Sequence, residues 1–274
     1  MNFIAKLELA QQKNNSLLCV GLDPVLERLP ISCRRDKEPF LSFNRALIEA
    51  TADLVCAYKP QIAHYAACGA EVELLATIRY LKENYPDIPV ILDAKRGDIG
   101  STAEKYAIEA FERYQADAVT VNPYLGGDSL EPFLGYAEKG VIILCRTSNP
   151  GGADLQGLMV DGEALYLKLA HLAAGEWNKK GNILLVVGAT WPAELARVRE
   201  IVGKIPLLVP GIGAQGGDLK AVLDAGLDSR GLGLVINSSR GIIYAGSGVD
   251  FADASRQAAL ALRDEINRHR CRLS

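Results

Sequence analysis

The sequence predicts a (β/α)₈ barrel, and three observations lead to this prediction. Short apolar runs alternate with amphipathic stretches, a pattern typical of parallel strands joined by crossover helices. Eight such units can be counted, which favours a closed barrel over an open sheet. The length of 274 residues suits one barrel, and no linker or change of composition divides the chain. We therefore expect a single barrel domain over residues 1–274.

Apolar runs and helical periodicity place the individual elements. The expected strands are 17–22, 54–59, 88–95, 116–122, 140–146, 183–187, 206–210 and 231–237. The expected crossover helices are 40–52, 70–84, 102–114, 130–138, 163–177, 193–202, 218–225 and 251–268. Residues 2–13 predict an extra N-terminal helix across the bottom of the barrel. The pattern from Ser101 to Glu104 is a capping box, which predicts a helix start near Thr102 and a loop over 97–100.

The composition argues against several classes of protein. Hydrophobic residues make up 49% of the chain and charged residues 23%, as in ordinary soluble globular proteins. The net charge of −3 gives no sign of a nucleic-acid surface. We find neither a signal peptide nor an apolar run long enough to span a membrane. Six cysteines without a C-x-x-C pair indicate a reduced, cytoplasmic protein.

The segment 90–98 carries the most functional information. An apolar run there ends in three charged residues, Asp93, Lys95 and Asp98. Residues two apart in a strand point to the same face, so Asp93 and Lys95 are expected to project together from the end of the strand. A carboxylate and an ammonium placed side by side each keep the other ionised. The alternative interpretation is an ordinary surface ion pair.

Other expected strands also end in polar residues, and in a barrel of this kind the catalytic groups lie at the carboxyl ends of the strands. The first strand is followed by Asp23 and the second ends at Lys59, while the fourth ends at Asn122. A polar residue at the end of one strand is weak evidence for a site, because every strand ends at the surface, where polar residues are common. The joint pattern of Asp23 and Lys59 with Asp93 and Lys95 favours an active site.

A glycine-rich turn follows the seventh expected strand. Residues 211–216 match G-x-G-x-x-G, the pattern of dinucleotide-binding turns. The acidic residue expected at the end of the next strand is missing, and Asn237 stands there instead. With Ser239 and Arg240 close behind, a monophosphate site is the better interpretation. The three histidines have no ligand spacing, so we expect no metal site.

Four motifs in this order give the chain a family resemblance. They are Asp93-Ala-Lys95-Arg-Gly-Asp98, Thr147-Ser148-Asn-Pro-Gly, Pro210-Gly-Ile-Gly-Ala-Gln215 and Ser239-Arg240. Together they resemble the orotidine 5′-phosphate decarboxylases, in their longer bacterial branch. The resemblance implies decarboxylation of orotidine 5′-phosphate to UMP, the last step of de novo pyrimidine nucleotide synthesis. It also implies a homodimeric barrel that uses neither a metal nor an organic cofactor.

The resemblance assigns the charged residues to one catalytic network. Lys59, Asp93 and Lys95 form it, and Asp98 of the partner subunit completes it. The partner's Thr102 also serves the site. Lys95 is the expected general acid at C6 of the pyrimidine, since an ammonium can neutralise the charge that develops there and then donate its proton. The two aspartates keep this ammonium charged and fixed.

The resemblance places the remaining site residues on the nucleotide. Asp23 is expected to bind the ribose hydroxyls and Ser148 the pyrimidine. Gln215 bridges the base and the phosphate, while Arg240 binds the phosphate beside Ser239. The gly-rich, polar segment 147–161 is a candidate lid.

Three other functions remain as alternatives. The first is a related barrel enzyme, a decarboxylase or aldolase, that acts on a sugar phosphate with Mg²⁺. The second is a nicotinamide-dependent oxidoreductase built on the glycine-rich turn. The third is a sugar-phosphate binder without catalysis, which the charged strand ends disfavour.

Overall fold

The chain folds as a barrel of eight parallel strands in the computed structural model, which describes residues 1–212 and 217–270. The strands are β1 (Leu18–Leu22), β2 (Ala57–Pro60), β3 (Ile91–Arg96), β4 (Ala118–Val121), β5 (Gly140–Arg146), β8 (Ile183–Val187), β9 (Leu207–Pro210) and β10 (Leu234–Ser238). Their order is β2-β1-β10-β9-β8-β5-β4-β3. Two parallel bridges, Tyr58 to Val90 and Gln61 to Asp93, join β2 to β3. These bridges close the barrel, as the sequence predicted.

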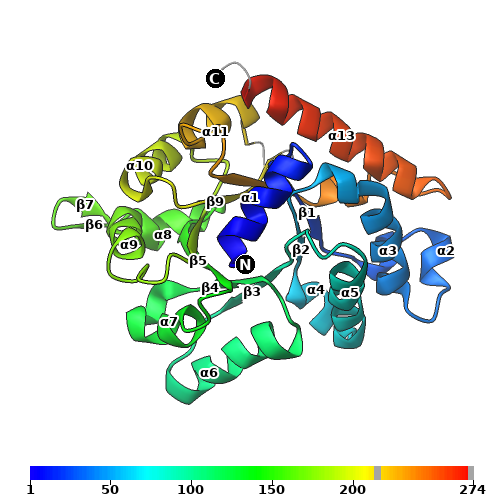
Figure 1. The fold of residues 1–274 in the computed structure, drawn as a ribbon, viewed down its shortest axis with the longest axis horizontal. Helices are drawn as coiled ribbons and strands as arrows, with labels where there is room; N and C mark the ends of the chain where they lie inside the picture. The colour runs from blue at the N-terminus through cyan, green and yellow to red at the C-terminus, as the bar shows by residue number, and fades with distance from the viewer. Residues whose placement is uncertain (213–216, 271–274) are drawn as a thin grey trace.

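Helices surround the strands on the outside (Figure 1). The long ones are α3 (Pro39–Thr51), α5 (Glu71–Asn84), α6 (Gly100–Ile108), α7 (Gly127–Leu134), α9 (Leu165–Ala174), α10 (Pro192–Val202), α11 (Leu219–Gly226) and α13 (Phe251–Arg270). Short helices lie in the connections: α2 (Ile31–Arg34), α4 (Ile62–Ala66), α8 (Ala153–Gln156) and α12 (Arg240–Ile243). None of the helices in the described ranges is long and apolar enough to cross a membrane.

Alternating residues of the strands fill the barrel interior. The inward-facing set is Cys19, Ala57, Ile91, Ala118, Ile142, Leu184, Val186, Leu208 and Val235, all of them buried. The residues between them point outward and form a second apolar core under the helices. Each strand is therefore apolar on both faces, which is why it reads as a continuous apolar run. Charged side chains can reach solvent or a ligand only at the ends of the strands.

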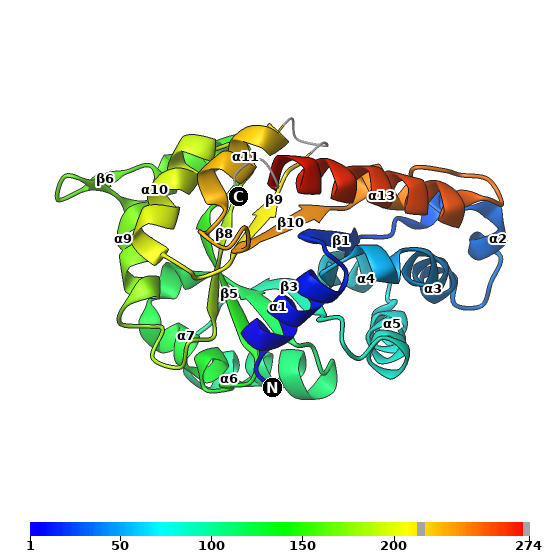
Figure 2. The same cartoon turned by 45° about the horizontal axis from the view of Figure 1, so that its top comes forward.

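The predicted N-terminal helix closes the bottom of the barrel. Helix α1 (Phe3–Lys13) lies across the centre of the strands in Figure 1 and at their lower end in Figure 2. Phe3 and Leu7 belong to the interior core. Gly140 leaves room for the Phe3 ring, because a Cβ at that position would clash with it. The open end of the barrel is thus the end where the strands finish.

Several predicted boundaries need correction. The second strand begins at Ala57 rather than at residue 54, because Ala52–Leu54 form a 3₁₀ turn. The helix expected over 163–177 is shorter, since Glu163–Ala164 pair with Met159–Val160 as the hairpin β6–β7. This hairpin projects from the barrel beside α9 in both ribbon views. Segment 102–114 is α6 followed by a π-helical turn, Glu109–Arg113.

The capping-box prediction is wrong. Helix α6 begins at Gly100, and its N-cap is Ile99, which has no capping side chain. The Ile99 carbonyl accepts the Thr102 and Ala103 amides, so Ser101 lies inside the first turn of the helix and cannot be its N-cap. Gly100 permits this earlier start because its φ of +52° is accessible to glycine. The loop after β3 is consequently one residue shorter than expected.

A half-buried carboxylate ties α1 to the bottom of the barrel. Asp117, just before β4, accepts hydrogen bonds from Lys6 at 2.9 Å, Lys82 at 3.3 Å and the Val90 amide at 2.9 Å. Burial would raise the pKa of Asp117, but the charge and hydrogen bond of Lys6, together with Lys82, hold this pKa below its ordinary value. The ionised carboxylate is therefore the form that stabilises the fold.

We expect Asp117→Ala to lower the free energy of unfolding by about 2–4 kcal/mol at neutral pH, because it leaves Lys6 and the Val90 amide without their partner. Asp117→Asn is the matched control, since it removes the charge but keeps an acceptor. The folded-state pKa lies below the unfolded value of 3.8, so the stability difference between wild type and Asp117→Asn is fully present above that pH. It should shrink as the pH falls below 3.8. Urea unfolding at several pH values measures this, and a difference that grows in acid would contradict the assignment.

Candidate active site

The charged end of β3 departs from regular strand geometry. Leu92 pairs with Val119, and Arg96 pairs with Val121, so β3 carries two more residues than β4 between these pairs. Within this bulge Lys95 has a φ of +46°, in the left-handed region that a residue with a Cβ rarely adopts. The sequence predicted that Asp93 and Lys95 project together, and they do. The bulge brings them together, however, and not the regular alternation of a strand.

Asp93 is the centre of the charged cluster. Its Oδ2 accepts a hydrogen bond from Lys59 Nζ at 2.7 Å, and its Oδ1 accepts one from Lys95 Nζ at 2.7 Å. Asp93 and Lys59 are buried, with exposed fractions of 7% and 4%. The Lys95 side chain is 48% exposed at the open end of the barrel. One ammonium is therefore held inside the barrel, and the other stands where a ligand could reach it.

Burial and charge act against each other in this cluster. Burial alone would raise the pKa of Asp93, but the charges and hydrogen bonds of Lys59 and Lys95 hold it well below its usual range. Burial would likewise lower the pKa of Lys59, yet the charges of Asp93 and Asp23 raise it above its ordinary value. Asp93 and Lys59 are therefore ionised at neutral pH, as a buried pair of opposite charges.

Thr120 is a site residue that the sequence analysis missed. It lies on β4, is 1% exposed, and donates a hydrogen bond from Oγ1 to Asp93 Oδ1 at 2.9 Å. Charged residues at strand ends mark a site in the sequence, whereas Thr120 is uncharged and lies inside an apolar run. The signal that could have found it is a hydroxyl at a strand position otherwise occupied by buried apolar residues.

Asp23 and Ser239 lie beside each other at the open end, although they are far apart in the sequence. Asp23 directly follows β1, and its Oδ1 is buried without a hydrogen-bond partner among the described residues. Ser239 follows β10 and reaches over Gly21, where a Cβ would clash with the Ser239 hydroxyl. Asp23 is half-buried at this end of the barrel, and the described residues leave part of the hydrogen-bonding capacity of its carboxylate unused.

The predicted phosphate residues are partly described. Arg240 begins α12, is exposed, and forms no ion pair with a carboxylate among residues 1–212 and 217–270. Asn237 is buried at the end of β10, and its Oδ1 has no described partner. Gln215 lies outside the described residues, as does most of the glycine-rich turn. The described part thus offers one exposed guanidinium at this edge of the barrel.

The loop after β5 is held firmly at Ser148. Trp191 Nε1 donates to the Thr147 carbonyl at 2.9 Å, and Thr190 Oγ1 donates to the Ser148 carbonyl at 3.2 Å. A Cβ at Gly188 would lie 2.6 Å from Ser148 Cα, so only glycine permits this close approach. Ser148 is half-buried at the open end of the barrel. Its position fits the predicted contact with a ligand.

Asp98 and Thr102 do not join the cluster of their own chain. Asp98 Oδ1 accepts the neighbouring Ile99 amide at 2.8 Å, and no ion pair links it to a described cation. Thr102 is exposed on the first turn of α6. Within one chain, therefore, no hydrogen bond or ion pair among the described residues links these two predicted site residues to Lys95.

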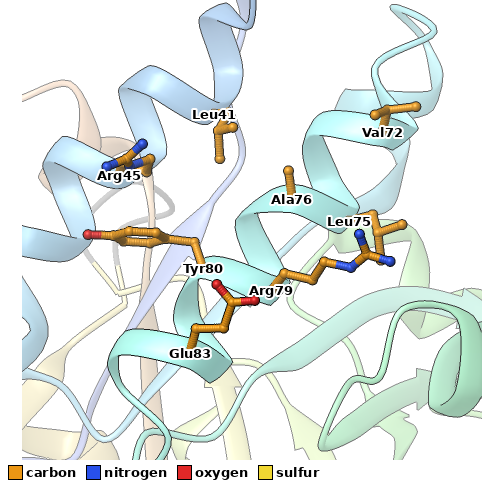
Figure 3. A pocket seen from close by; sticks show the side chains of 8 residues that line it. All are labelled: Leu41, Arg45, Val72, Leu75, Ala76, Arg79, Tyr80 and Glu83. Carbon is orange, nitrogen blue, oxygen red and sulfur yellow. The ribbon is translucent and has the colours of Figure 1, made fainter.

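Other candidate sites carry less chemistry. In the described ranges, no three or more His, Cys, Asp or Glu side chains are grouped so that they could hold a metal ion. A groove of about 280 Å³ lies on the outer surface between α3 and α5 (Figure 3). Its Arg45 stacks on the Tyr80 ring at 4.7 Å, and Arg79 lines the same groove. It is separate from the charged cluster inside the barrel.

Comparison with known proteins decides the family. The model of the Orotidine 5′-phosphate decarboxylase / HUMPS family matches residues 16–254. The chain belongs to this family. The match spans the charged cluster of β2 and β3 as well as Ser148, Ser239 and Arg240.

Individual relatives agree with this result. The chain is 63% identical to an orotidine 5′-phosphate decarboxylase of Dechloromonas aromatica (strain RCB), over 98% of this chain and 100% of the relative. It is 60% identical to the protein of the same name from Cellvibrio japonicus (strain Ueda107), over 97% and 98%. A solved structure of Leishmania donovani OMP decarboxylase superposes with a TM-score of 0.86 at 44% identity, covering 98% of this chain and 99% of that one. The alternative functions are not favoured by these matches.

Proposed function

We propose that the protein decarboxylates orotidine 5′-phosphate to UMP at the open end of the barrel. The observation that carries the proposal is the Lys59–Asp93–Lys95 cluster, in which one ammonium is buried and the other is exposed toward a ligand. The family and its 60% identical relatives support the same reaction. We propose that it catalyses the final step of pyrimidine nucleotide synthesis and does so in the cytoplasm.

The chemistry explains why an ammonium is needed. Loss of carbon dioxide from C6 leaves an electron pair in an orbital outside the π system of the ring, so resonance cannot absorb it. The protein must supply positive charge at that carbon. Lys95 provides this charge and then transfers its proton to C6, while Asp93 keeps the ammonium fixed. Because Lys95 supplies the charge, we propose that no metal or organic cofactor takes part.

The other residues hold the nucleotide in place. The half-buried carboxylate of Asp23 binds the ribose hydroxyls, and Ser148 stands on a firmly held loop for the pyrimidine. Arg240 offers an exposed guanidinium for the phosphate, with Ser239 beside it and Gln215 proposed to assist. Binding energy from the remote phosphate can be used to lower the barrier at C6. We propose that the segment 147–161 closes over the bound nucleotide.

We propose a homodimer in which Asp98 and Thr102 of the partner subunit complete each site. Neither residue is bonded to the cluster of its own chain among the described residues, and exposed apolar side chains lie on the same side of the chain's loops: Ile99 is 60% exposed and Tyr124 77%. Ile99 and Tyr124 lie on neighbouring loops, because the Asn122 amide before one loop donates to the Arg96 carbonyl before the other. An exposed apolar surface of this kind is typical of an interface. A second copy seated there would bring its acidic loop toward Lys95.

Direct assay of the purified protein tests the reaction. Wild type should consume orotidine 5′-phosphate, followed by its absorbance, at the same rate with and without EDTA. Lys95→Ala should nearly abolish turnover, because no other described ammonium is exposed beside Asp93. Its fold should survive, as judged by circular dichroism, since Lys95 is half exposed. Near-normal turnover by this variant, or inhibition of wild type by EDTA, would refute the mechanism.

Arg240→Ala should weaken binding of the nucleotide far more than it slows the chemical step. Loss of a charge-assisted contact to phosphate is expected to raise KM by about 10–100-fold. The same substitution should leave the affinity for uridine unchanged, because uridine lacks the phosphate. Arg79→Ala, in the outer groove of Figure 3, is the matched control and should keep the KM of wild type. If Arg240→Ala keeps it too, the phosphate site lies elsewhere.

Mixed dimers test the shared site. Lys95→Ala and Asp98→Ala should each be inactive alone, but a mixed dimer contains one site with both native residues. Equal mixing makes about half of the dimers mixed, so about a quarter of the wild-type activity should return. The double variant Lys95→Ala/Asp98→Ala mixed with Lys95→Ala is the control and should recover nothing. Inactivity of the first mixture, despite exchange of subunits shown by native mass spectrometry, would argue against the partner's Asp98.

A further inference from the structure

The Thr120 hydroxyl makes three hydrogen bonds at the centre of the site. It donates to Asp93 Oδ1 at 2.9 Å and accepts the backbone amides of Ala94 at 3.0 Å and Lys95 at 2.9 Å. A hydroxyl has one proton to donate and two lone pairs to accept with, so its capacity is fully used. Thr120 is therefore bonded both to the side chain of one charged residue and to the backbone of another.

The bulge in β3 explains why these bonds are needed. In a regular parallel ladder the amides of a strand bond to carbonyls of its neighbour. The extra residues between Leu92 and Arg96 break that register against β4. A side-chain hydroxyl of β4 then takes the Ala94 and Lys95 amides, in place of a carbonyl. Lys95 can keep its unfavourable φ of +46° only while surrounding bonds hold it there.

We propose that Thr120 is a positioning residue, whose hydroxyl holds the β3 bulge so that the Lys95 ammonium points at the reacting carbon. The inference rests on the proposed role of Lys95. Thr120 touches neither the substrate nor the proton that is transferred. It acts by fixing the backbone from which Lys95 projects and the carboxylate that Lys95 contacts.

This role makes a specific demand on side-chain chemistry. Valine has nearly the shape of threonine but no hydroxyl, so Thr120→Val leaves the Ala94 and Lys95 amides without their acceptor and removes one of the two hydrogen bonds to Asp93 Oδ1. The bulge can then relax, and the Lys95 ammonium shifts. Serine keeps the hydroxyl and loses only a methyl group. If the hydroxyl positions Lys95, Thr120→Ser should keep the kcat that Thr120→Val loses.

The test compares kcat, KM and the affinity for UMP in these variants. We expect Thr120→Val to lower kcat by about 10–100-fold, the range expected for a small misplacement of a catalytic group. KM and the UMP dissociation constant, measured by calorimetry, should stay close to wild type, because the bonds of Thr120 all lie within the protein. Thr120→Ser should retain most of the wild-type kcat.

A matched control separates positioning from general loss of stability. Thr77 is fully buried on α5, where its Oγ1 accepts Asn44 Nδ2 at 3.1 Å, remote from the charged cluster. Thr77→Val also removes a buried hydroxyl and should keep the kcat of wild type. If Thr120→Val does not fold, Thr120→Ala replaces it, and its kcat is compared with that of Thr120→Ser.

The outcomes distinguish this inference from the proposed function. Wild-type kcat in Thr120→Val or Thr120→Ala overturns the role of Thr120 and leaves that of Lys95 intact. Equal losses of kcat in the Thr120→Ser and Thr120→Val proteins, or in the Thr77→Val protein, also overturn it. Full turnover by Lys95→Ala would instead refute the proposed function itself.

Discussion

The carboxylate of Asp93 accepts hydrogen bonds from two lysines, and the charged end of the barrel depends on this shared ion pair. Its two oxygens lie 2.7 Å from the ammonium groups of Lys59 and Lys95. Bringing these charges into the barrel costs free energy unless they compensate one another. Asp93 therefore allows a protein interior to hold positive charge close to where a reaction can use it.

The architecture explains how such a cluster can exist. The strands are apolar on both faces, and α1 closes the bottom of the barrel, so the open end is where charged side chains can gather. There the chain departs from regular structure: β3 bulges, and Lys95 adopts a positive φ. Strain of this kind persists only when neighbouring bonds impose it. The Thr120 hydroxyl supplies two such bonds from the adjacent strand.

Each chain contains most, but not all, of the proposed site. Asp23, Ser148 and the adjacent pair Ser239 and Arg240 stand around the open end, on three different connections of the barrel. Asp98 lies on the loop after β3, and its side chain accepts the amide of the neighbouring Ile99. An incomplete site beside an exposed apolar surface is what a shared active site looks like in one isolated subunit. The proposed dimer accounts for both features together.

The sequence alone determined the barrel and most of the charged cluster, because both leave local signals. An apolar run on both faces marks a buried parallel strand, and a charged residue directly after it marks the strand end. Tertiary structure decided the rest. The helix start at Gly100 and the hydroxyl of Thr120 depend on backbone geometry and on a neighbouring strand. Contacts between residues that are distant in the sequence leave no local pattern, so only the folded chain shows which side chains and backbone groups form hydrogen bonds.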